Sequence, residues 1–210
     1  RIKDIDDRFI MIPAHIWTPW FSVFGSKSGF DSLEECFGDM TEYIYAVETG
    51  LSSDPLMNRS LSALDNVMLI SNSDAHSPRK FGREANVFEI DQASYSYDEI
   101  IRIFKDRDYN AFKYTIEFFP EEGKYHQDGH AACKFWCLPA KTKKLKGRCP
   151  HCAQLITVGV SSRVSDLADR KITKFFENQM PYKSIVPLDQ ILCEVYGVVS
   201  PNSKKVQLMY

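Results

Sequence analysis

Short apolar runs alternate with amphipathic stretches over residues 1–120 of the chain. Each run is short enough to be a buried β-strand, and turn residues bound most of them. The runs cover residues 9–14, 43–47, 67–70, 86–90 and 111–119. Buried strands that alternate with helices predict an α/β fold with a parallel sheet or a barrel.

Polar residues mark where helices should begin between these strands. Asp31 or Ser32 can cap a short helix over residues 31–37. Ser53-Asp54-Pro55 opens a second helix, with proline tolerated in the first turn. Ser96 and Glu99 form a capping box before a third helix.

The pattern changes after residue 120. Residues 121–160 are rich in Gly, Pro, Lys, Cys and His, which indicates a small separate module. Helical patterns return at residues 163–174 and 187–196. We therefore expect an α/β part at 1–120, a small module at 121–160 and a helical C-terminal segment at 161–210.

Composition narrows the class of protein. The 210 residues are 44% hydrophobic and 26% charged, which is typical of a globular protein. The formal net charge is −2, so any contact with nucleic acid must come from local basic patches. No apolar run reaches about 18 residues and no secretory signal opens the chain, so we expect a cytoplasmic protein without a membrane partner. Because the chain runs from Arg1 to Tyr210, we interpret it as a fragment cut at both ends.

Potential metal ligands follow three of the predicted strands. His15 follows the first, Glu48 the second, and Asp74 and His76 the third. Active sites of β/α barrels are built where the carboxyl ends of the strands converge. Imidazole and carboxylate together suit Zn²⁺, Mn²⁺ or Fe²⁺ in a hydrolytic site. For Asp74 the alternative is a cap for a turn that begins at Ser77, and for Glu48 it is an ordinary loop carboxylate.

His15 after a strand, followed by the S-N-S-D-A-H sequence at a later strand end, resembles the PHP (polymerase and histidinol phosphatase) phosphoesterases. Longer stretches resemble the endonuclease Q family in particular, and this likeness runs through nearly all of the chain. They are I-P-A-H-I-W-T-P-W-F-S-V-F-G-S-K-S-G-F-D-S at 12–32, V-E-T-G-L-S-S-D-P at 47–55, S-N-S-D-A-H-S-P at 71–78, T-I-E-F-F-P-E-E-G-K-Y-H-Q-D-G-H at 115–130 and R-V-S-D-L-A-D-R at 163–170.

The resemblance implies a fold and an activity. The fold would be the C-terminal part of a distorted PHP-type barrel, with two or three active-site metal ions (Zn, Mn or Mg). The activity would be cleavage of DNA on the 5′ side of deaminated bases such as uracil and hypoxanthine, and at abasic sites. By motif, His15, Asp74 and His76 would bind metal, and loss of Asp74 should silence the enzyme. The family's N-terminal H-x-H motif is absent from these residues, so the chain alone is expected to hold an incomplete site.

Aromatic residues crowd the segment after His15. Selection of a damaged base requires a pocket outside the base stack, and aromatic side chains can stack on such a base. The alternative is that these rings simply cover the barrel. The segment contains Trp17, Trp20, Phe21, Phe24 and Phe30, with Lys27 among them as a candidate DNA contact.

Four of the six cysteines lie within twenty residues, in the pattern C-x3-C-x11-C-x2-C. Clustered thiols at such spacing predict a structural Zn²⁺ in a reducing compartment, with a redox pair as the alternative. Ala153 stands where such knuckles commonly have glycine, and His126, His130 and His151 are reserve ligands. The predicted ligands are Cys133, Cys137, Cys149 and Cys152.

A basic run separates the two cysteine pairs. Five positive charges on a loop pinned by metal suit a phosphate backbone, and the alternative is a solvated surface loop. The run contains Lys141, Lys143, Lys144, Lys146 and Arg148.

These observations favour a metal-dependent endonuclease acting on DNA with deaminated bases. One alternative is a PHP phosphatase for a small phosphomonoester, which would have no use for the cysteines or the basic run. The other is an inactive DNA-binding module. A helicase is set aside because no G-x-x-x-x-G-K-[ST] phosphate loop occurs in these residues.

Overall fold

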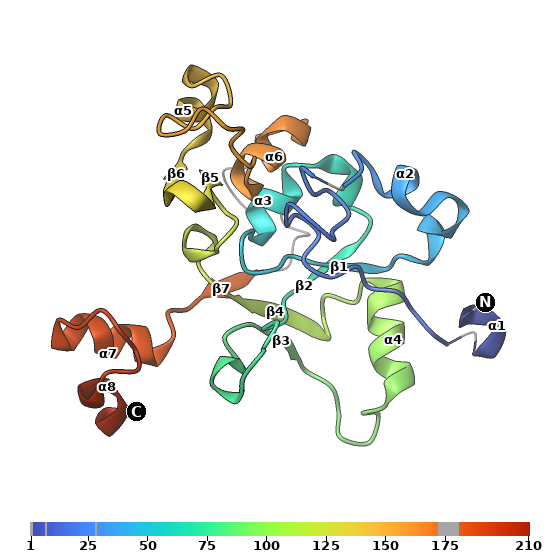
Figure 1. Ribbon diagram of the computed structural model, residues 1–210. Helices are drawn as coiled ribbons and strands as arrows, with labels where there is room; N and C mark the ends of the chain where they lie inside the picture. Colours follow the sequence, from blue (N-terminus) through green and yellow to red (C-terminus); the bar gives the residue numbers. More distant parts are fainter. Residues whose placement is uncertain (1, 7, 28, 172–180) are drawn as a thin grey trace.

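The computed structural model describes residues 2–6, 8–27, 29–171 and 181–210. Its strands form three small sheets (Figure 1). The first pairs β1 (Ala46–Glu48) with β2 (Met68–Ile70) in parallel. The second has the order β3 (Ala85–Phe88), β4 (Phe112–Glu117), β7 (Tyr182–Ser184), and the third pairs β5 (Asp128–His130) with β6 (Phe135–Cys137).

Short helices surround these sheets. The α-helices are α1 (Ile2–Ile5), α2 (Leu33–Phe37), α3 (Pro55–Arg59), α4 (Tyr97–Asp106), α5 (Pro139–Lys144), α6 (Val160–Leu167), α7 (Leu188–Tyr196) and α8 (Lys204–Met209). The 3-10 turns are η1 (Gly38–Tyr43), η2 (Ser62–Leu64), η3 (Pro78–Lys80), η4 (Pro120–Glu122) and η5 (Ala131–Cys133). Of the helices in the described part of the chain, none has the length and apolar composition that a bilayer crossing requires.

The three predicted helix caps are confirmed. The Ser32 side chain accepts a hydrogen bond from the amide of Glu35 at the start of α2. Asp54 caps α3 in the same way, and Ser96 caps α4. Each cap satisfies an amide that the first turn of a helix otherwise leaves unpaired, so these boundaries follow from local sequence.

Several predicted strands differ from the structure. Residues 9–14 form no strand. The end of this segment lies next to β1, where the backbone amide of Glu48 donates to the carbonyl of Pro13. Strands β3 and β4 pair antiparallel rather than parallel. The described strands lie in three separate sheets and not in one closed barrel sheet. Apolar runs identify buried segments, but the partner of each strand depends on residues far away in sequence.

The predicted helix at 163–174 is shorter and starts earlier, as α6, and residues 172–174 lie outside the described residues. The helix predicted at 187–196 is confirmed as α7.

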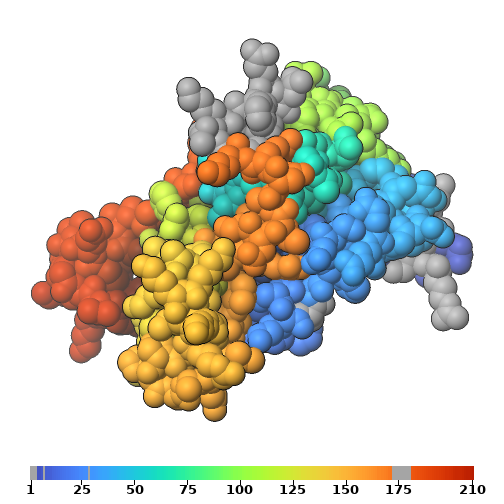
Figure 2. Space-filling model, turned by 90° about the horizontal axis from the view of Figure 1, so that it is seen from above, coloured from blue at the N-terminus to red at the C-terminus, as the bar shows by residue number. Residues whose placement is uncertain are grey.

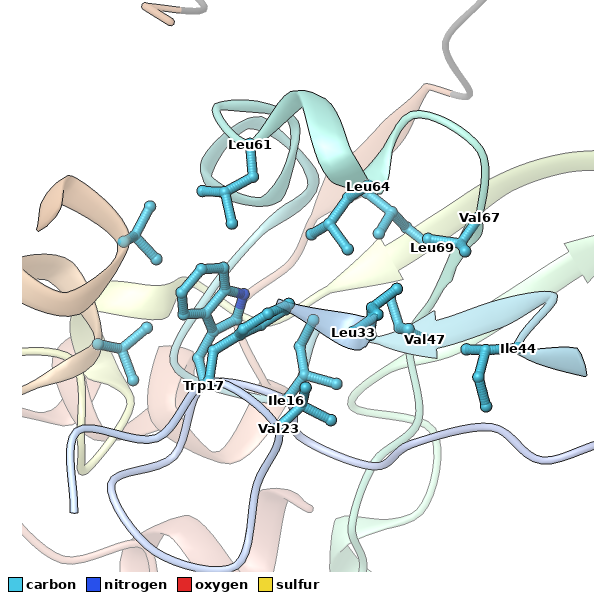
Figure 3. Packing of buried hydrophobic residues seen from close by; sticks show 13 residues of the cluster. Ile16, Trp17, Val23, Leu33, Ile44, Val47, Leu61, Leu64, Val67 and Leu69 are labelled. Atoms are coloured by element: carbon cyan, nitrogen blue, oxygen red, sulfur yellow. The ribbon is translucent and has the colours of Figure 1, made fainter. Parts of the chain in front are cut away.

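Two hydrophobic clusters lie on opposite sides of β1 and β2. Val47 and Leu69 belong to one cluster, which also contains Trp17 and residues of α6 (Figure 3). Ala46 and Met68 belong to the other cluster, which packs against α4. Alternate residues of a strand face opposite sides, so burial of every residue in β1 and β2 means that the sheet is covered on both faces.

Residues 121–160, hereafter the cysteine module, project from this core beside α6 (Figures 1 and 2). The pair of helices α7 and α8 projects in another direction, beyond β7 (Figure 1). The ends of β1 and β2, the segment after His15 and the cysteine module together present the residues predicted to act on DNA.

Candidate functional site

His15 lies next to Glu48, which is the last residue of β1. The backbone amide of His15 donates to Oε2 of Glu48 over 2.6 Å. His15 has a φ of 32°, a left-handed backbone conformation that is uncommon for this residue type. Gly50, with a φ of 70°, makes room for it, because a Cβ there would lie 2.9 Å from the His15 Cα. The V-E-T-G sequence therefore places a buried carboxylate and an imidazole at one strand end.

Two asparagines connect this pair to the end of β2. The Asn72 side-chain amide donates to Oε1 of Glu48 over 2.9 Å. The Asn86 amide donates in turn to Oδ1 of Asn72 over 3.1 Å and to the carbonyl of Ser71 over 2.9 Å. The carboxylate is thus oriented by groups from two other segments. Neither Asn72 nor Asn86 was predicted as a site residue, although Asn72 lies two residues after β2 within the S-N-S-D-A-H sequence.

Asp74 and His76 stand at the surface beyond β2. Their side chains are 50% and 86% exposed, and the nearest carboxylate oxygen lies 3.9 Å from Nδ1 of His76. Nδ1 of His76 is 2.8 Å from the Asp74 carbonyl, and Asp74 has a left-handed φ of 44°. The N-cap position of η3 is occupied by Ser77, whose side chain makes no capping hydrogen bond. Asp74 therefore does not cap this helical turn.

The four predicted active-site ligands do not gather into one cluster within the described residues. The structure brings His15 to Glu48 and Asp74 to His76, as two pairs linked through Asn72 and the end of β2. Imidazole nitrogens and carboxylate oxygens suit a hydrolytic divalent metal, and each Glu48 oxygen keeps a lone pair beyond its one hydrogen bond. The residues are chemically suited to part of a metal site, and their role as ligands stays a prediction.

Two further carboxyl groups are buried near these strand ends, and the sequence analysis missed both. Glu117 of β4 has no exposed surface and accepts hydrogen bonds from Thr49 (3.1 Å) and Thr115 (2.5 Å). Burial raises the pKa of Glu117 to about 8, with the charge of Glu84 adding to the effect. Glu84 accepts the Phe118 amide at one oxygen, while burial raises its pKa to about 7.

The cysteine module brings together His130, Cys133, Cys149 and Cys152. One ligand atom from each residue lies within 4.8 Å of the others, and Cys152 Sγ is 3.5 Å from Nδ1 of His130. Three thiols and one imidazole form a donor set that tetrahedral Zn²⁺ takes in structural sites. This group can therefore hold one structural metal ion.

Cys137 lies outside this group, in contrast to the predicted four-cysteine set. The register of the β5–β6 hairpin pairs His130 with Phe135 and Asp128 with Cys137. Cys137 therefore sits at the opposite end of the hairpin from His130. Its thiol is buried and lies 3.3 Å from the Thr142 hydroxyl. The spacing identified a metal module, but the hairpin register decides which residue completes it.

Thiol ionisation within the group is uneven. Hydrogen bonding from Cys133 to Cys152 raises the pKa of the Cys133 thiol. Burial opposes ionisation of Cys149, but the amides of His151 and Cys152 lower the pKa of its thiol overall. Thiolate is the form that binds metal, so the lowered pKa of Cys149 favours metal binding by this residue. Ala153 adopts a φ of 60°, the left-handed turn for which knuckles commonly use glycine.

The other two histidines predicted as alternative zinc ligands, His126 and His151, are not part of this group. His126 is buried, with Nδ1 3.0 Å from the Ser52 carbonyl, so it ties the module to the core. The ring of His151 contacts the ring of Phe135 edge to face, with 5.7 Å between centroids.

The aromatic segment after His15 divides into two sets. Trp17 and Phe24 belong to the core, with ring centroids 4.8 Å apart, and Trp17 donates to the Asn58 side chain over 2.7 Å. These two rings are almost completely buried, so they contribute to the core. Trp20, by contrast, is 43% exposed and contacts the ring of Tyr125 edge to face. Lys27 is exposed on the same segment.

The basic run is a short helix and a turn rather than a loop. Lys141, Lys143 and Lys144 lie on α5, and the Lys141 ammonium lies 5.5 Å from the centroid of the Phe135 ring. Lys146 and Arg148 follow in the turn, where Arg148 donates to the carbonyl of Ala153 over 3.0 Å. All five residues are exposed. The module thus presents a local positive surface on a chain of slightly negative net charge.

The chain is similar to two uncharacterized proteins over most of its own length. No protein-family model matches the chain. An uncharacterized protein of Methanocaldococcus jannaschii is 34% identical over 86% of the chain and 22% of its own length. The uncharacterized protein YqxK of Bacillus subtilis is 34% identical over 81% of the chain and 41% of its own length. The chain thus spans less than half the length of these relatives.

Two solved structures share the fold. The crystal structure of the lesion-specific endonuclease PfuEndoQ from Pyrococcus furiosus matches 95% of the chain and 48% of its own chain, with a TM-score of 0.77 and 32% identity. The second is a crystal structure of Endonuclease Q in complex with a 27-mer duplex that carries an abasic lesion at the active site. It matches 95% of this chain and 49% of its own chain, with a TM-score of 0.81 and 31% identity.

Proposed function

Because this chain belongs to the endonuclease Q family, we propose that it forms part of a metal-dependent DNA repair endonuclease. The proposed reaction is hydrolysis of the phosphodiester on the 5′ side of a deaminated base or an abasic site. The observation that carries this proposal is the structural match of 95% of the chain to two endonucleases, one of them holding damaged duplex DNA.

We propose that His15, Glu48, Asp74 and His76 contribute ligands to active-site divalent ions. Such ions, when bound, lower the pKa of a bound water and stabilise the charge that develops on phosphate oxygens. The chain's own contribution is orientation. The His15 amide and the Asn72 side chain fix the Glu48 carboxylate, and the left-handed backbone of Asp74 sets the direction of its side chain. The rest of the ligand set would come from residues beyond the chain.

DNA binding would fall to the cysteine module and the segment after His15. Exposed lysines on α5 suit phosphate contacts, which position DNA without reading its sequence. A structural Zn²⁺ held by His130 and three cysteines would keep this small, polar module folded. A phosphatase for a small monoester gains nothing from such a surface, so the geometry favours the endonuclease.

The test is cleavage of end-labelled duplex DNA with one uracil, one hypoxanthine or one abasic site, with Mn²⁺, Mg²⁺ or Zn²⁺ supplied. We expect the full-length protein to nick the damaged strand on the 5′ side of the lesion. Asp74→Ala should lower the rate at least ~100-fold, because the metal site loses a carboxylate ligand. Asp91→Ala, at an exposed carboxylate between β3 and α4, is the matched control and should cleave normally.

Two results would contradict the proposal. The first is phosphate release from a small monoester by a protein that leaves every damaged duplex intact. The second is a nick that persists unchanged in Asp74→Ala, which would show that the hydrolytic site lies elsewhere.

A further inference from the structure

Two buried carboxyl groups lie opposite each other where β3 begins and β4 ends. The antiparallel register pairs Ala85 with Ile116, and one step further along both strands it places Glu84 opposite Glu117. Side chains that are directly opposite on antiparallel strands point to the same face, with Cβ atoms roughly 4.5–5.5 Å apart. Glu117 has no exposed surface and Glu84 is 3% exposed. Two like charges in this position are destabilising, and the lack of solvent increases the cost.

The donors to the four carboxyl oxygens are hydroxyl and amide groups. Glu117 accepts the hydroxyl of Thr115 at Oε1 over 2.5 Å and the hydroxyl of Thr49 at Oε2 over 3.1 Å. Glu84 accepts the backbone amide of Phe118 at Oε1 over 3.1 Å. Its Oε2 is buried and has no hydrogen-bond partner among the described residues. A buried oxygen without a donor favours the neutral form of the carboxyl group.

The other ionisable groups around the pair add mostly negative charge. They are Glu48 of β1, Arg83 directly before Glu84, and Tyr182 of β7, whose hydroxyl donates to Asp54 at the start of α3. Burial is the main cause of the raised pKa of Glu84, and the charge of Glu48 adds to it, whereas Arg83 opposes it. Nε of Arg83 donates to the carbonyl of Ser73 over 2.8 Å. The surroundings therefore favour a pair that keeps at least one proton near pH 7.

The pair is connected to Glu48 by two routes. The sheet of β3, β4 and β7 lies beside the ends of β1 and β2 (Figure 1). Thr49, which donates to Glu117, directly follows Glu48 in the chain. Asn86 of β3 donates to the side chain of Asn72, which donates in turn to Oε1 of Glu48. A displacement of the facing ends of β3 and β4 would therefore change the orientation of the Glu48 carboxylate.

We propose that Glu84 and Glu117 form a carboxyl pair that shares one proton and positions Glu48 for the chemistry of the candidate site. The inference rests on the proposed function and adds two positioning residues, since both groups are buried and act through their neighbours. When both groups are ionised, two negative charges face each other across β3 and β4. Their repulsion separates the strand ends that hold Thr49 and Asn86, so the pair sets an alkaline limit to the geometry of the site.

The first experiment measures the shared proton without DNA or metal. Metal-free full-length protein is labelled with ¹³C at the glutamate carboxyl carbons, and NMR follows each carboxyl resonance with pH. Glu84→Gln should lower the midpoint of Glu117 by about one pH unit or more, because strongly coupled groups titrate as a pair. Glu117→Gln should lower the midpoint of Glu84 in the same way. Glu89→Gln, at an exposed carboxylate paired with Lys113, is the matched control and should leave both midpoints unchanged.

Two results of this titration would overturn the inference. Midpoints that stay the same when the partner is replaced would show that the two groups are only buried and do not share a proton. Midpoints below about pH 5 for both groups would show that both are ionised near pH 7, as ordinary glutamates are. Circular dichroism checks that each variant is folded, and the two variants test the same coupling from opposite sides.

The second experiment measures positioning through the pH dependence of cleavage. The unaltered full-length protein should cut damaged duplex about 10-fold more slowly at pH 9 than at pH 7, because pH 9 lies one unit above the pKa of about 8 of Glu117. With Glu84→Gln or Glu117→Gln, two facing charges cannot form, so the ratio of the two rates should lie close to one. A merely structural role would lower the rate at both pH values alike.

The two experiments separate this inference from the proposed function. The same fall between pH 7 and pH 9 in the unaltered protein and in both glutamine variants would overturn the positioning role. A protein that leaves every damaged duplex intact would contradict the proposed function, and the NMR titration would still decide whether the pair shares a proton.

Discussion

Burial in the folded chain changes the ionisation of two carboxyl groups, those of Glu84 and Glu117. Glu117 lies on a strand with no exposed surface, where the hydroxyls of Thr49 and Thr115 donate to its carboxyl oxygens. Glu84 has one oxygen, Oε2, that is buried without a hydrogen-bond partner among the described residues. Burial outweighs the hydrogen bonds that these carboxyls accept, so it favours the protonated form of both.

This arrangement predicts a stability that depends on pH. The pKa of Glu117 is about 8 in the folded chain against 4.5 for the ordinary side chain. The group therefore contributes its full stability below pH 4.5 and loses it as the pH rises toward 8. Glu117→Gln keeps the shape of the side chain but cannot become charged. At pH 8 this variant should therefore unfold at a higher urea concentration than the unaltered chain. The difference should be on the order of 2–4 kcal/mol, and near zero at pH 4.5.

Urea unfolding of metal-free protein at both pH values checks this. Glu89→Gln is the control, because Glu89 is exposed and its stability effect should be small at either pH. A Glu117→Gln variant that is equally destabilised at both pH values would show that the carboxyl is not protonated in the folded chain.

At the scale of elements, the β5–β6 hairpin decides how the cysteine module closes. Its strands are three residues long, and their antiparallel register sets His130 and Cys137 at opposite ends. The left-handed residue Lys134 turns the chain between them. A metal ion held at one end of so short a hairpin would stabilise the folded module.

This register predicts that substitution of Cys149 and substitution of Cys137 affect zinc binding differently. Cys149→Ser should lose the bound zinc, roughly one ion per chain, and unfold the module. Cys137→Ser should keep the zinc, because a serine hydroxyl can replace the thiol as the partner of Thr142. Zinc content by mass spectrometry of purified protein distinguishes the two variants. Loss of zinc from both would restore the four-cysteine site predicted from spacing.

At the scale of the whole molecule, positive charge is concentrated on one part of the surface although the net charge is close to zero. The net charge is −2, yet the exposed lysines of α5 gather on the projecting cysteine module. In Figure 2 this module stands out from the body of the molecule beside the segment after His15. At physiological salt, exposed charges more than about 8 Å apart are largely screened from each other. The local patch therefore affects DNA binding more than the net charge does.

The patch predicts a change in the salt dependence of DNA binding. Lys141→Gln combined with Lys144→Gln should weaken binding to damaged and undamaged duplex alike. The slope of log affinity against log salt should become shallower by about 1 for each phosphate that the variant no longer neutralises. Lys113→Gln is the control, because Lys113 lies on β4 and pairs with Glu89 at 2.9 Å. An unchanged slope in the double variant would assign the lysines to a solvated surface.

Much of this protein followed from its sequence alone. Helix starts at Ser32, Asp54 and Ser96 were predictable because a cap depends on residues three apart. The buried strands at 67–70 and 111–119 were visible as apolar runs, and the spacing of cysteines indicated a metal module. Long sequence motifs indicated the endonuclease Q family, because many residues must match at once.

Only the tertiary structure decided how these pieces meet. Strand β7, the antiparallel pairing of β3 with β4, and the grouping of His130, rather than Cys137, with the other three cysteines all depend on the folded arrangement. The difference between the buried ring of Trp17 and the partly exposed ring of Trp20 has the same cause. The sequence determined which chemical groups are present and where local structure begins, because both depend on neighbours along the chain. Burial and strand register arise from packing, which local patterns do not encode.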